Sequence, residues 1–413
     1  MIHYKQFKNG LRLIINKMEG MYSVSCGVAV KTGSVNETEE INGISHFIEH
    51  MLFKGTTTRT AFEISDSIDR IGAQINAFTS KELTCYYTKS TKEHVGETLE
   101  ILSDIFFNST FDKVEMEREK GVVIEEINMS EDSPEDVCLD LLAKSYFGTN
   151  GYGRTILGTA KNVRSFNKDK IKDYMNKYYT ADNVVISIAG NVDVSLTERL
   201  VEEYFANNFK VYKSSKQKDV KPTRPTHLYR TKKIEQAHIG FAMKGLSIND
   251  EMGDAFSIAN IVLGGGMSSR LFQKIREELG LAYSVYSYAS CYKNQGVLEI
   301  CAGVTSEQRD NACNAIIEEV RRIKKDGITE NEFMRGKEQV KSAMIMSRES
   351  TGSQMLLHAK HLILLDKTFD FNKNLKKLEK ITLKDVLDAI DLSFDIDNAS
   401  TATVGRKKTP LVI

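Results

Sequence analysis

Two histidines and a glutamate that could hold and use a metal ion lie within five residues of one another. The segment NGISHFIEHMLFKG contains His46, Glu49 and His50 in the pattern HxxEH. In a helix, imidazoles at positions i and i+4 point the same way one turn apart, which suits two ligands of one ion. Imidazoles are common zinc ligands, and Glu49 beside them could take a proton from an attacking water. The pattern therefore indicates zinc-assisted hydrolysis.

The residues around this motif predict the helix that it requires. Apolar residues recur at helical spacing on one side of residues 42–53, and the histidines and Glu49 fall on the other. Asn42 is expected as the N-cap and Gly55 as the stop. A solvated helix face without a metal is the alternative, but a chance HxxEH in a chain with 8 histidines is rare, on the order of 1%.

A third ligand is expected from a second helix, from about Asp112 to Ser130. In it, Glu119 and Glu126 are seven residues apart, two turns along a face that also carries valine. Carboxylates on such a face are costly to bury unless something pairs with them, and a metal ion would do so. Glu125 is turned by about 100° and is the weaker candidate. Taken alone, these glutamates are more typical of a solvated stripe, but beside an HxxEH a ligand is favoured.

The two halves of the chain repeat one order of strands and helices, which indicates a duplication. Equivalent points, such as Gly72 and Gly280, are 208 residues apart. In the first half we predict, in this order, strand 22–30, helices 42–53 and 60–71, strands 75–80 and 83–90, and a further helix. In the second half we predict the same order: strand 238–243, a helix that ends at 263, helix 269–279, strands 283–290 and 297–304, and a further helix.

The 413 residues are therefore predicted to form two similar tandem domains of about 200 residues. The expected fold class is α+β, with a mostly antiparallel sheet covered by helices in each domain. The first domain is expected at 1–209, with the HxxEH motif, and the second at 234–413, without it. Between them, we predict a basic linker at 210–233, because this segment contains nine Lys or Arg but only one Asp and shows no apolar periodicity.

The composition bears on whether the protein binds nucleic acid or membranes and on where in the cell it is expected. The 56 Lys and Arg balance the 56 Asp and Glu, so no general attraction to nucleic acid or to an anionic membrane is expected. No stretch is long and apolar enough to cross a bilayer, and the start lacks the apolar core of a secretory signal. The six scattered cysteines are typical of buried thiols in a reducing compartment. We expect a cytoplasmic protein.

The chain also resembles a known family, the pitrilysin/insulinase zinc peptidases. The resemblance rests on HFIEHMLFKGT, on EREKGVVIEE downstream, and on SSRLFQKIREELGLAYSVYS in the second half. It is closest to the two-domain subunits of the mitochondrial processing peptidase type and their bacterial relatives, and it covers the whole length. The resemblance implies a metalloendopeptidase with one zinc ion per chain.

The resemblance also assigns roles to five polar residues of the first half. It makes His46, His50 and Glu126 the zinc ligands and Glu49 the general base. Glu119 becomes an acidic residue that orients a ligand or the substrate.

Substrate contacts are likewise implied by the family. A peptide is expected to add as an extended strand along the segment with Asn76, Ala77 and Phe78, where main-chain hydrogen bonds provide affinity. Arg276 and Tyr283 in the second half match a pair that contacts the substrate carbonyl, where both can donate to a developing oxyanion. Without the resemblance, Tyr283 reads as a core tyrosine and Arg276 as a surface charge.

The relatives further imply a homodimer with composite active sites, in which each zinc faces Arg276 and Tyr283 of the partner. A catalytically inert assembly subunit is the main alternative, because the family includes structural members; a nucleic-acid binder is a further one, disfavoured by the neutral charge.

Two weaker patterns are expected to be structural. Gly264–Gly266 is expected to end a helix and not to bind phosphate, and His358 and His361 are not expected to form a second metal site.

Overall fold

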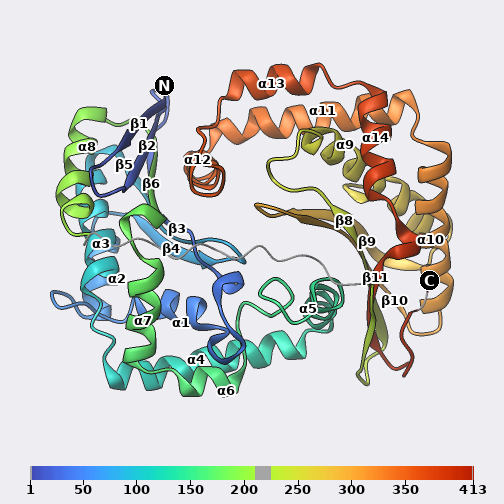
Figure 1. Cartoon of the computed structure of the whole chain (residues 1–413), viewed down its shortest axis with the longest axis horizontal. Coiled ribbons are helices and arrows are strands. Elements are labelled where there is room, and N and C mark those ends of the chain that lie inside the picture. The colour runs from blue at the N-terminus through green and yellow to red at the C-terminus, as the bar shows by residue number, and fades with distance from the viewer. Residues whose placement is uncertain (1, 210–224, 412) are drawn as a thin grey trace. The chain divides into compact units, whose positions relative to one another are not determined.

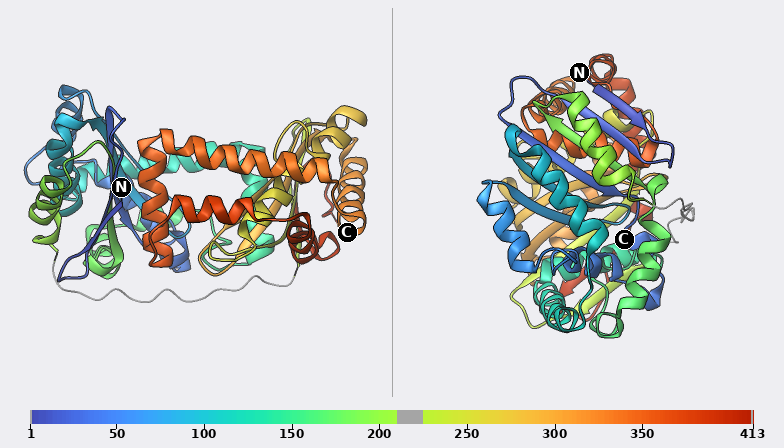
Figure 2. Two further views of the ribbon diagram at one scale, coloured as in Figure 1. Left: turned by 90° about the horizontal axis from the view of Figure 1, so that it is seen from above. Right: turned by 90° about the vertical axis from the view of Figure 1, so that its left-hand side faces the viewer.

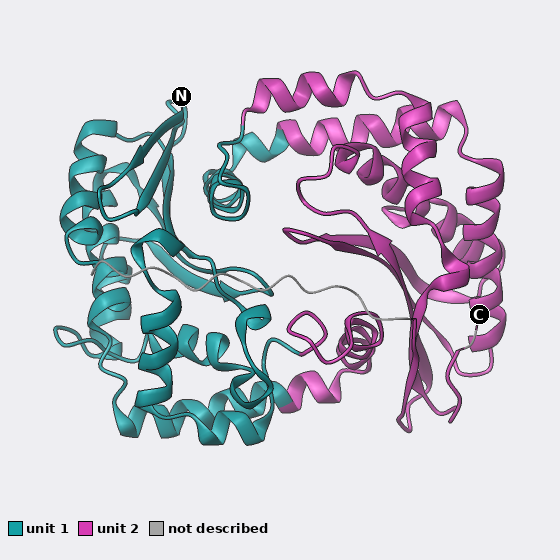
Figure 3. Cartoon of the chain, viewed as in Figure 1, with its two compact units in different colours: residues 1–127, 155–218, 346–369 teal, residues 128–154, 219–345, 370–413 magenta. Residues whose placement is uncertain are grey.

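The computed structural model describes residues 2–209, 225–411 and 413, which form two compact units (Figure 3). Unit 1 comprises the described residues of Met1–Ile127, Thr155–Lys218 and Met346–Phe369, and unit 2 those of Asn128–Arg154, Asp219–Ile345 and Asp370–Ile413. The predicted domains, 1–209 and 234–413, differ from these units in two segments, 128–154 and 346–369, each of which belongs with the other half of the chain. A helical pattern shows which face of a helix is buried but not which sheet buries it.

The predicted linker, 210–233, falls outside the described residues from 210 to 224. Its last part contains β7 (His227–Thr231), a strand that pairs in parallel with β11 (Ser400–Gly405). The linker prediction is therefore wrong for this part. β7 is a half-exposed strand of mostly polar residues, so its sequence carries no apolar alternation that would reveal it.

Unit 1 is built on a six-stranded sheet in the order β1-β2-β6-β3-β5-β4 (Figure 1). Its neighbouring strands are antiparallel except for the parallel pair β2 and β6. The central strand β3 is buried almost throughout, whereas β4 forms one edge of the sheet. The strands are β1 (Ile2–Gln6), β2 (Arg12–Lys17), β3 (Ser23–Val30), β4 (Gln74–Thr79), β5 (Thr84–Thr91) and β6 (Val184–Gly190).

Helices cover both faces of this sheet, which explains why β3 is buried on both sides (Figures 1 and 2). α12 packs against β6 and β3, and α3 covers the opposite face. α1 packs against β4, β5 and α7. The helices are α1 (Ile44–Met51), α2 (Ala61–Arg70), α3 (Val95–Asn108), α4 (Lys113–Asp132, whose last residues belong to unit 2), α6 (Ala160–Ser165), α7 (Lys168–Tyr178), α8 (Val194–Val201) and α12 (Thr351–Leu365).

Unit 2 repeats this plan with a five-stranded sheet in the order β7-β11-β8-β10-β9. Its one parallel pair is β7 and β11, and α5 packs against β11 and β8. The predicted helix 269–279 is wound as a π-helical turn at Phe272–Glu278. The other elements are β8 (Gln236–Gly245), β9 (Ala282–Cys291), β10 (Gly296–Thr305), α5 (Pro134–Phe147), α9 (Gly253–Gly264), α10 (Arg309–Asp326), α11 (Glu330–Met346), α13 (Phe371–Glu379) and α14 (Leu383–Ser393).

The predicted α+β class, with two mostly antiparallel sheets covered by helices, is confirmed. The duplication is visible at single residues: Gly72 and Gly280 each precede an edge strand, and both have a φ of +60°. This backbone region disfavours residues with a Cβ, so both copies use glycine at the same turn. Within the ranges that the structure describes, no helix combines the length and the apolar character needed to span a membrane.

Candidate metal centre

The HxxEH motif lies in helix α1, as the sequence predicts. Ile44, Phe47, Ile48 and Met51 recur at spacings of three and four and are buried in the core of unit 1. The rings of His46 and His50 are one turn apart, with 4.6 Å between their centroids. The predicted N-cap is wrong, because Gly43 caps the helix and Asn42 donates to Glu37 and to the carbonyl of Thr155 instead.

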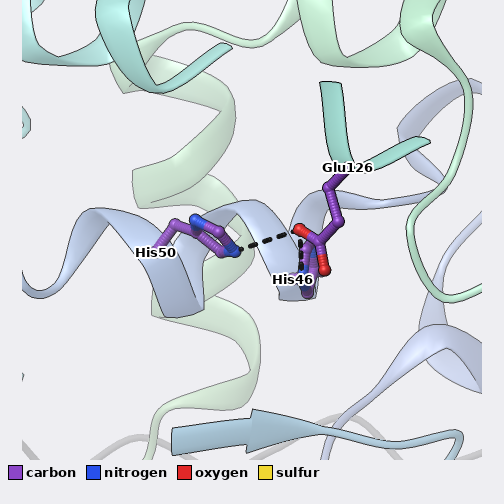
Figure 4. A group of neighbouring side chains, drawn as sticks. All are labelled: His46, His50 and Glu126. Atoms are coloured by element: carbon purple, nitrogen blue, oxygen red, sulfur yellow. Dashed lines mark ion pairs between the residues drawn. The ribbon is translucent and has the colours of Figure 1, made fainter. Parts of the chain in front are cut away.

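The third side chain of the centre, Glu126, comes from helix α4 (Figure 4). Its Oε2 lies 3.6 Å from His46 Nε2 and 3.5 Å from His50 Nε2. Three ligand atoms, one from each residue, lie within 4.8 Å of one another. Two ligands each about 2.0–2.2 Å from a tetrahedral zinc ion are about 3.3–3.6 Å apart, so the observed N–O distances fit such an ion. Of the residues that the structure describes, these form the one cluster of this kind.

The two imidazoles differ in their surroundings. Burial, with a smaller effect from His50, lowers the pKa of His46 to about 4, so its ring is neutral near pH 7 and has a free lone pair. Burial also lowers the pKa of His50, but the hydrogen bond to Glu119 and the nearby carboxylates outweigh it and raise the pKa overall. A bound cation would replace the proton that these carboxylates favour.

Glu119 is a partner of His50 and not a member of the three-residue cluster. Its Oε1 lies 2.7 Å from His50 Nδ1, and its Oε2 accepts a bond of 2.8 Å from Lys54 Nζ. Burial alone would raise the pKa of Glu119, but these two bonds lower it. The carboxylate thus accepts from Nδ1 and leaves Nε2 directed at Glu126, an arrangement common for histidine ligands. Lys54 carried no signal in the sequence, because its role depends on a partner 65 residues away.

Glu49 lies on the same helix and accepts a hydrogen bond of 2.5 Å from Thr79 Oγ1. Burial raises the pKa of Glu49 against the opposing effects of Thr79 and His50. A carboxylate with a raised pKa is a stronger base, which suits the role that the sequence predicts for it. The sequence analysis missed Thr79, which lies on β4.

Asn76, Ala77 and Phe78 lie on the same strand, β4, at the edge of the sheet. They pair on one side with Tyr87, Tyr86 and Cys85 of β5. The N–H of Ala77 donates to Oδ1 of Asn76 at 2.8 Å, so it faces away from β5, toward the open edge. An extended chain could add to this edge beside Thr79 and Glu49.

Arg276 and Tyr283 lie together in unit 2. The Arg276 guanidinium is 5.4 Å from the centroid of the Tyr283 ring and 4.7 Å from that of Phe272. Tyr283 is 78% exposed, so it is not the core tyrosine that its strand position alone would indicate. The pair presents two donors at the surface of unit 2.

The weaker signals have structural explanations. His358 and His361 pack around the ring of Phe369, and neither belongs to a metal-binding cluster among the described residues. Gly264 ends helix α9 against Ser287, where a Cβ would lie 2.5 Å from the Ser287 nitrogen. Glu125 lies outside the three-residue cluster.

Comparison with known proteins places this chain in a family. Residues 12–160 match the family model described as insulinase (peptidase family M16), and residues 165–340 match the one described as peptidase M16 inactive domain. A Bacillus subtilis protein named "uncharacterized zinc protease YmxG" is 46% identical over 380 residues, which cover 92% of each chain. The chain belongs to the insulinase family, peptidase family M16.

Further proteins are similar to this chain in sequence or in fold. A Streptomyces coelicolor protein with a zinc-protease name is 35% identical over 390 residues, 91% of this chain and 84% of that one. A solved Helicobacter pylori protease has a TM-score of 0.90 at 20% identity and covers 98% and 99% of the two chains. A Pseudomonas fluorescens structure described as a peptidase M16 inactive domain has a TM-score of 0.90 at 18% identity, with 98% of each chain covered. These two structures show the fold alone.

Proposed function

We propose that this M16 chain is a zinc-dependent endopeptidase whose catalytic centre lies in unit 1. The observation that carries the proposal is the meeting of His46, His50 and Glu126 at ligand spacing, beside a partly buried carboxylate at Glu49. The relatives named zinc protease support it. The inert-subunit alternative is not favoured, because the ligand candidates and the candidate base are all present in one place.

Each residue then has a separate task in peptide hydrolysis. Zinc, when bound, would supply a Lewis acid that polarises the substrate carbonyl and makes a water molecule more acidic. His46, His50 and Glu126 would hold it, and Glu119 would keep the His50 ring in the required orientation. Glu49 takes a proton from the attacking water and returns it to the leaving amine as the C–N bond breaks.

The substrate class follows from the open edge of β4. A peptide that adds there must be extended, so unfolded peptides and precursor segments are expected to be cut and compact folded proteins to be spared. Asn76, Ala77 and Phe78 would line the added strand. Main-chain bonding makes little distinction between sequences, so conformation should matter more than side chains.

We further propose a homodimer with composite active sites. The support is the resemblance, together with the absence of a candidate metal cluster from the described part of unit 2, which carries Arg276 and Tyr283 instead. These two would donate to the substrate carbonyl oxygen at the zinc of the partner subunit. The cysteines, none of which forms a disulfide, support a reducing compartment, and we place the protein in the cytoplasm.

Cleavage of an internally quenched unstructured peptide tests the main proposal. The purified chain should cut it, a chelator should abolish cleavage, and added zinc should restore it. A native disulfide-bonded protein serves as the control and should survive the same incubation. A zinc-loaded chain that cuts no peptide, or cleavage that is indifferent to the chelator, would refute the assignment.

A further inference from the structure

The first turn of helix α1 needs partners for its backbone N–H groups. The opening N–H groups of any helix have no acceptor within that helix. In most helices the side chain of the N-cap residue supplies one, but the cap of α1 is Gly43, which has no side chain. Gly43 has a φ of +98°, and a Cβ there would lie 2.5 Å from the Leu157 carbonyl oxygen. The capping group must therefore come from elsewhere.

Glu37 supplies it from six residues before the cap. Its Oε2 accepts bonds from Gly43 N at 2.7 Å and from Asn42 Nδ2 at 2.8 Å, while its Oε1 accepts from Ser45 N at 2.9 Å. The residue is 4% exposed. A carboxylate at a helix N-terminus also interacts favourably with the helix dipole. Both oxygens are thus committed to the start of α1.

A second anchor holds the same turn from its side chain. The Ser45 hydroxyl is 2.8 Å from the hydroxyl of Tyr174, which is 2.8 Å from Thr32 Oγ1. These three residues are buried. Ser45 is therefore fixed through its backbone by Glu37 and through its side chain by Tyr174.

The residue after Ser45 is His46, the more buried of the two candidate histidine ligands at 7% exposed. A useful metal site requires its ligands to be held within about 0.5 Å of the productive geometry. A rotation or fraying of the first turn would move His46 directly, whereas His50 lies one turn further on and has Glu119 as its own partner.

We propose that Glu37 is a positioning residue for the metal centre, which sets the place of His46 by capping α1 from outside the helix. This inference rests on the proposed function, since it requires zinc at His46, His50 and Glu126. It predicts a loss of zinc affinity beyond what a general loss of stability would produce.

The test compares three variants with the wild-type chain. Glu37→Gln puts an amide NH₂ where one backbone donor needs an acceptor, and Glu37→Asp keeps the carboxylate but withdraws it by one methylene. The matched control is Asp193→Ala, which removes the N-cap of α8, also in unit 1, where Asp193 accepts from Leu196 N at 2.8 Å. Zinc dissociation constants from chelator competition, kcat, KM and the thermal midpoint are measured for each.

We expect Glu37→Gln to raise the zinc Kd at least about tenfold, as loss of a supporting partner does at other zinc sites, and to lower kcat at limiting zinc more than it changes KM. Glu37→Asp should recover part of the affinity. Asp193→Ala should lower the thermal midpoint by about 2–4 °C and leave the zinc Kd within twofold.

An unchanged Kd in Glu37→Gln, or an equal rise in Asp193→Ala, would overturn the inference. If Glu37→Gln does not fold, a wild-type Kd in Glu37→Asp does the same. The wild-type titration separates the two claims: a chain that binds no zinc overturns the proposed function and this inference together, whereas normal zinc binding that is insensitive to Glu37 overturns this inference alone.

Discussion

The two units share one scaffold but differ in what they place on it. In each, a parallel pair of strands leads into an antiparallel run that ends at an edge strand, β4 in unit 1 and β9 in unit 2. The helix that follows the central strand is α1 in one unit and α9 in the other. α1 carries two histidines and a glutamate beside its apolar face, while α9 carries no histidine. The scaffold alone therefore does not produce the site; a few polar residues on one helix do.

The partners of those residues sharpen the contrast. In unit 1, Glu119 is buried against His50 and Lys54, and Glu49 is held by Thr79. In unit 2, a partly buried ion pair has a structural role. Arg270 donates to both oxygens of Glu332, and Glu332 also accepts a hydrogen bond from the backbone N–H of Thr329 at the start of α11. Buried charge in unit 1 serves a candidate catalytic centre, and in unit 2 it fixes a helix.

The largest effect should come from Glu49. Glu49→Gln removes the proposed base while leaving the three candidate ligands in place, so kcat should fall about 10²–10⁴-fold and zinc should be retained. Ser257→Ala, at an exposed position of α9, is the matched control in unit 2 and should keep kcat within twofold. Peptide cleavage and metal analysis check both. Turnover above a tenth of wild type in Glu49→Gln would show that the base is another group.

The next effect concerns how the units cooperate. Tyr283→Phe should lower kcat about 10²-fold, because it removes the proposed donor to the substrate carbonyl oxygen. When Glu49→Gln and Tyr283→Phe chains are mixed and exchange subunits at random, a trans arrangement leaves about a quarter of all sites intact, so activity should return to about that fraction of wild type. Mixed chains that are as inactive as their parents, once exchange is verified, would contradict the composite site.

The acid sensitivity of unit 2 should be smaller but measurable. The hydrogen bond from Arg270 is the main cause that holds the pKa of Glu332 at about 2, below its usual value of 4.5. Because the folded-state pKa is depressed, the stabilisation is present above about pH 4.5 and is lost as the pH falls toward 2. Urea unfolding between pH 6 and pH 3 should show about 1–2 kcal/mol less acid loss in Glu332→Gln than in wild type, because part of the stabilisation persists at pH 3 and solvent screens the pair. Glu330→Gln, an exposed carboxylate on the same helix, is the control.

The smallest effect tests the equivalence of the two scaffolds. Gly72→Ala and Gly280→Ala each place a Cβ at a φ of +60°, where no other atom lies within 4 Å. The cost is therefore conformational alone, about 1 kcal/mol at each site. Urea unfolding should give similar losses for the two variants. A loss at one position several times that at the other would mean that the two turns are not equivalent.

Local patterns were enough to predict the helix with the HxxEH motif, the paired strands and the duplication, because each leaves a periodic signal within a short window. The choice between Glu119 and Glu126 could not be made from spacing, since both lie on one face of α4. The structure distinguishes the two glutamates by their contacts: Glu119 lies against Lys54 and His50 Nδ1, whereas Glu126 lies beside His50 Nε2. Thr79 and Glu37 act on residues 30 and 6 positions away through contacts that no periodicity encodes.

The exchange of segments between the units escaped prediction for a related reason. Segments 128–154 and 346–369 contain the helices α5 and α12, and the sheet that each helix covers is a matter of tertiary packing. α5 follows α4 of unit 1 in the chain and packs against β11 and β8 in unit 2. α12 lies late in the chain and packs against β6 and β3 in unit 1.

Metal stoichiometry tests the central claim most directly. Zinc is removed with a chelator, added back and counted per chain for the wild type, for His50→Ala and for His361→Ala, the last from the other histidine pair of unit 1. We predict one zinc ion per chain in the wild type and in His361→Ala, and none retained in His50→Ala. A wild-type chain that binds no zinc, or a His50→Ala chain that binds it undiminished, would contradict the assignment of the centre to His46, His50 and Glu126.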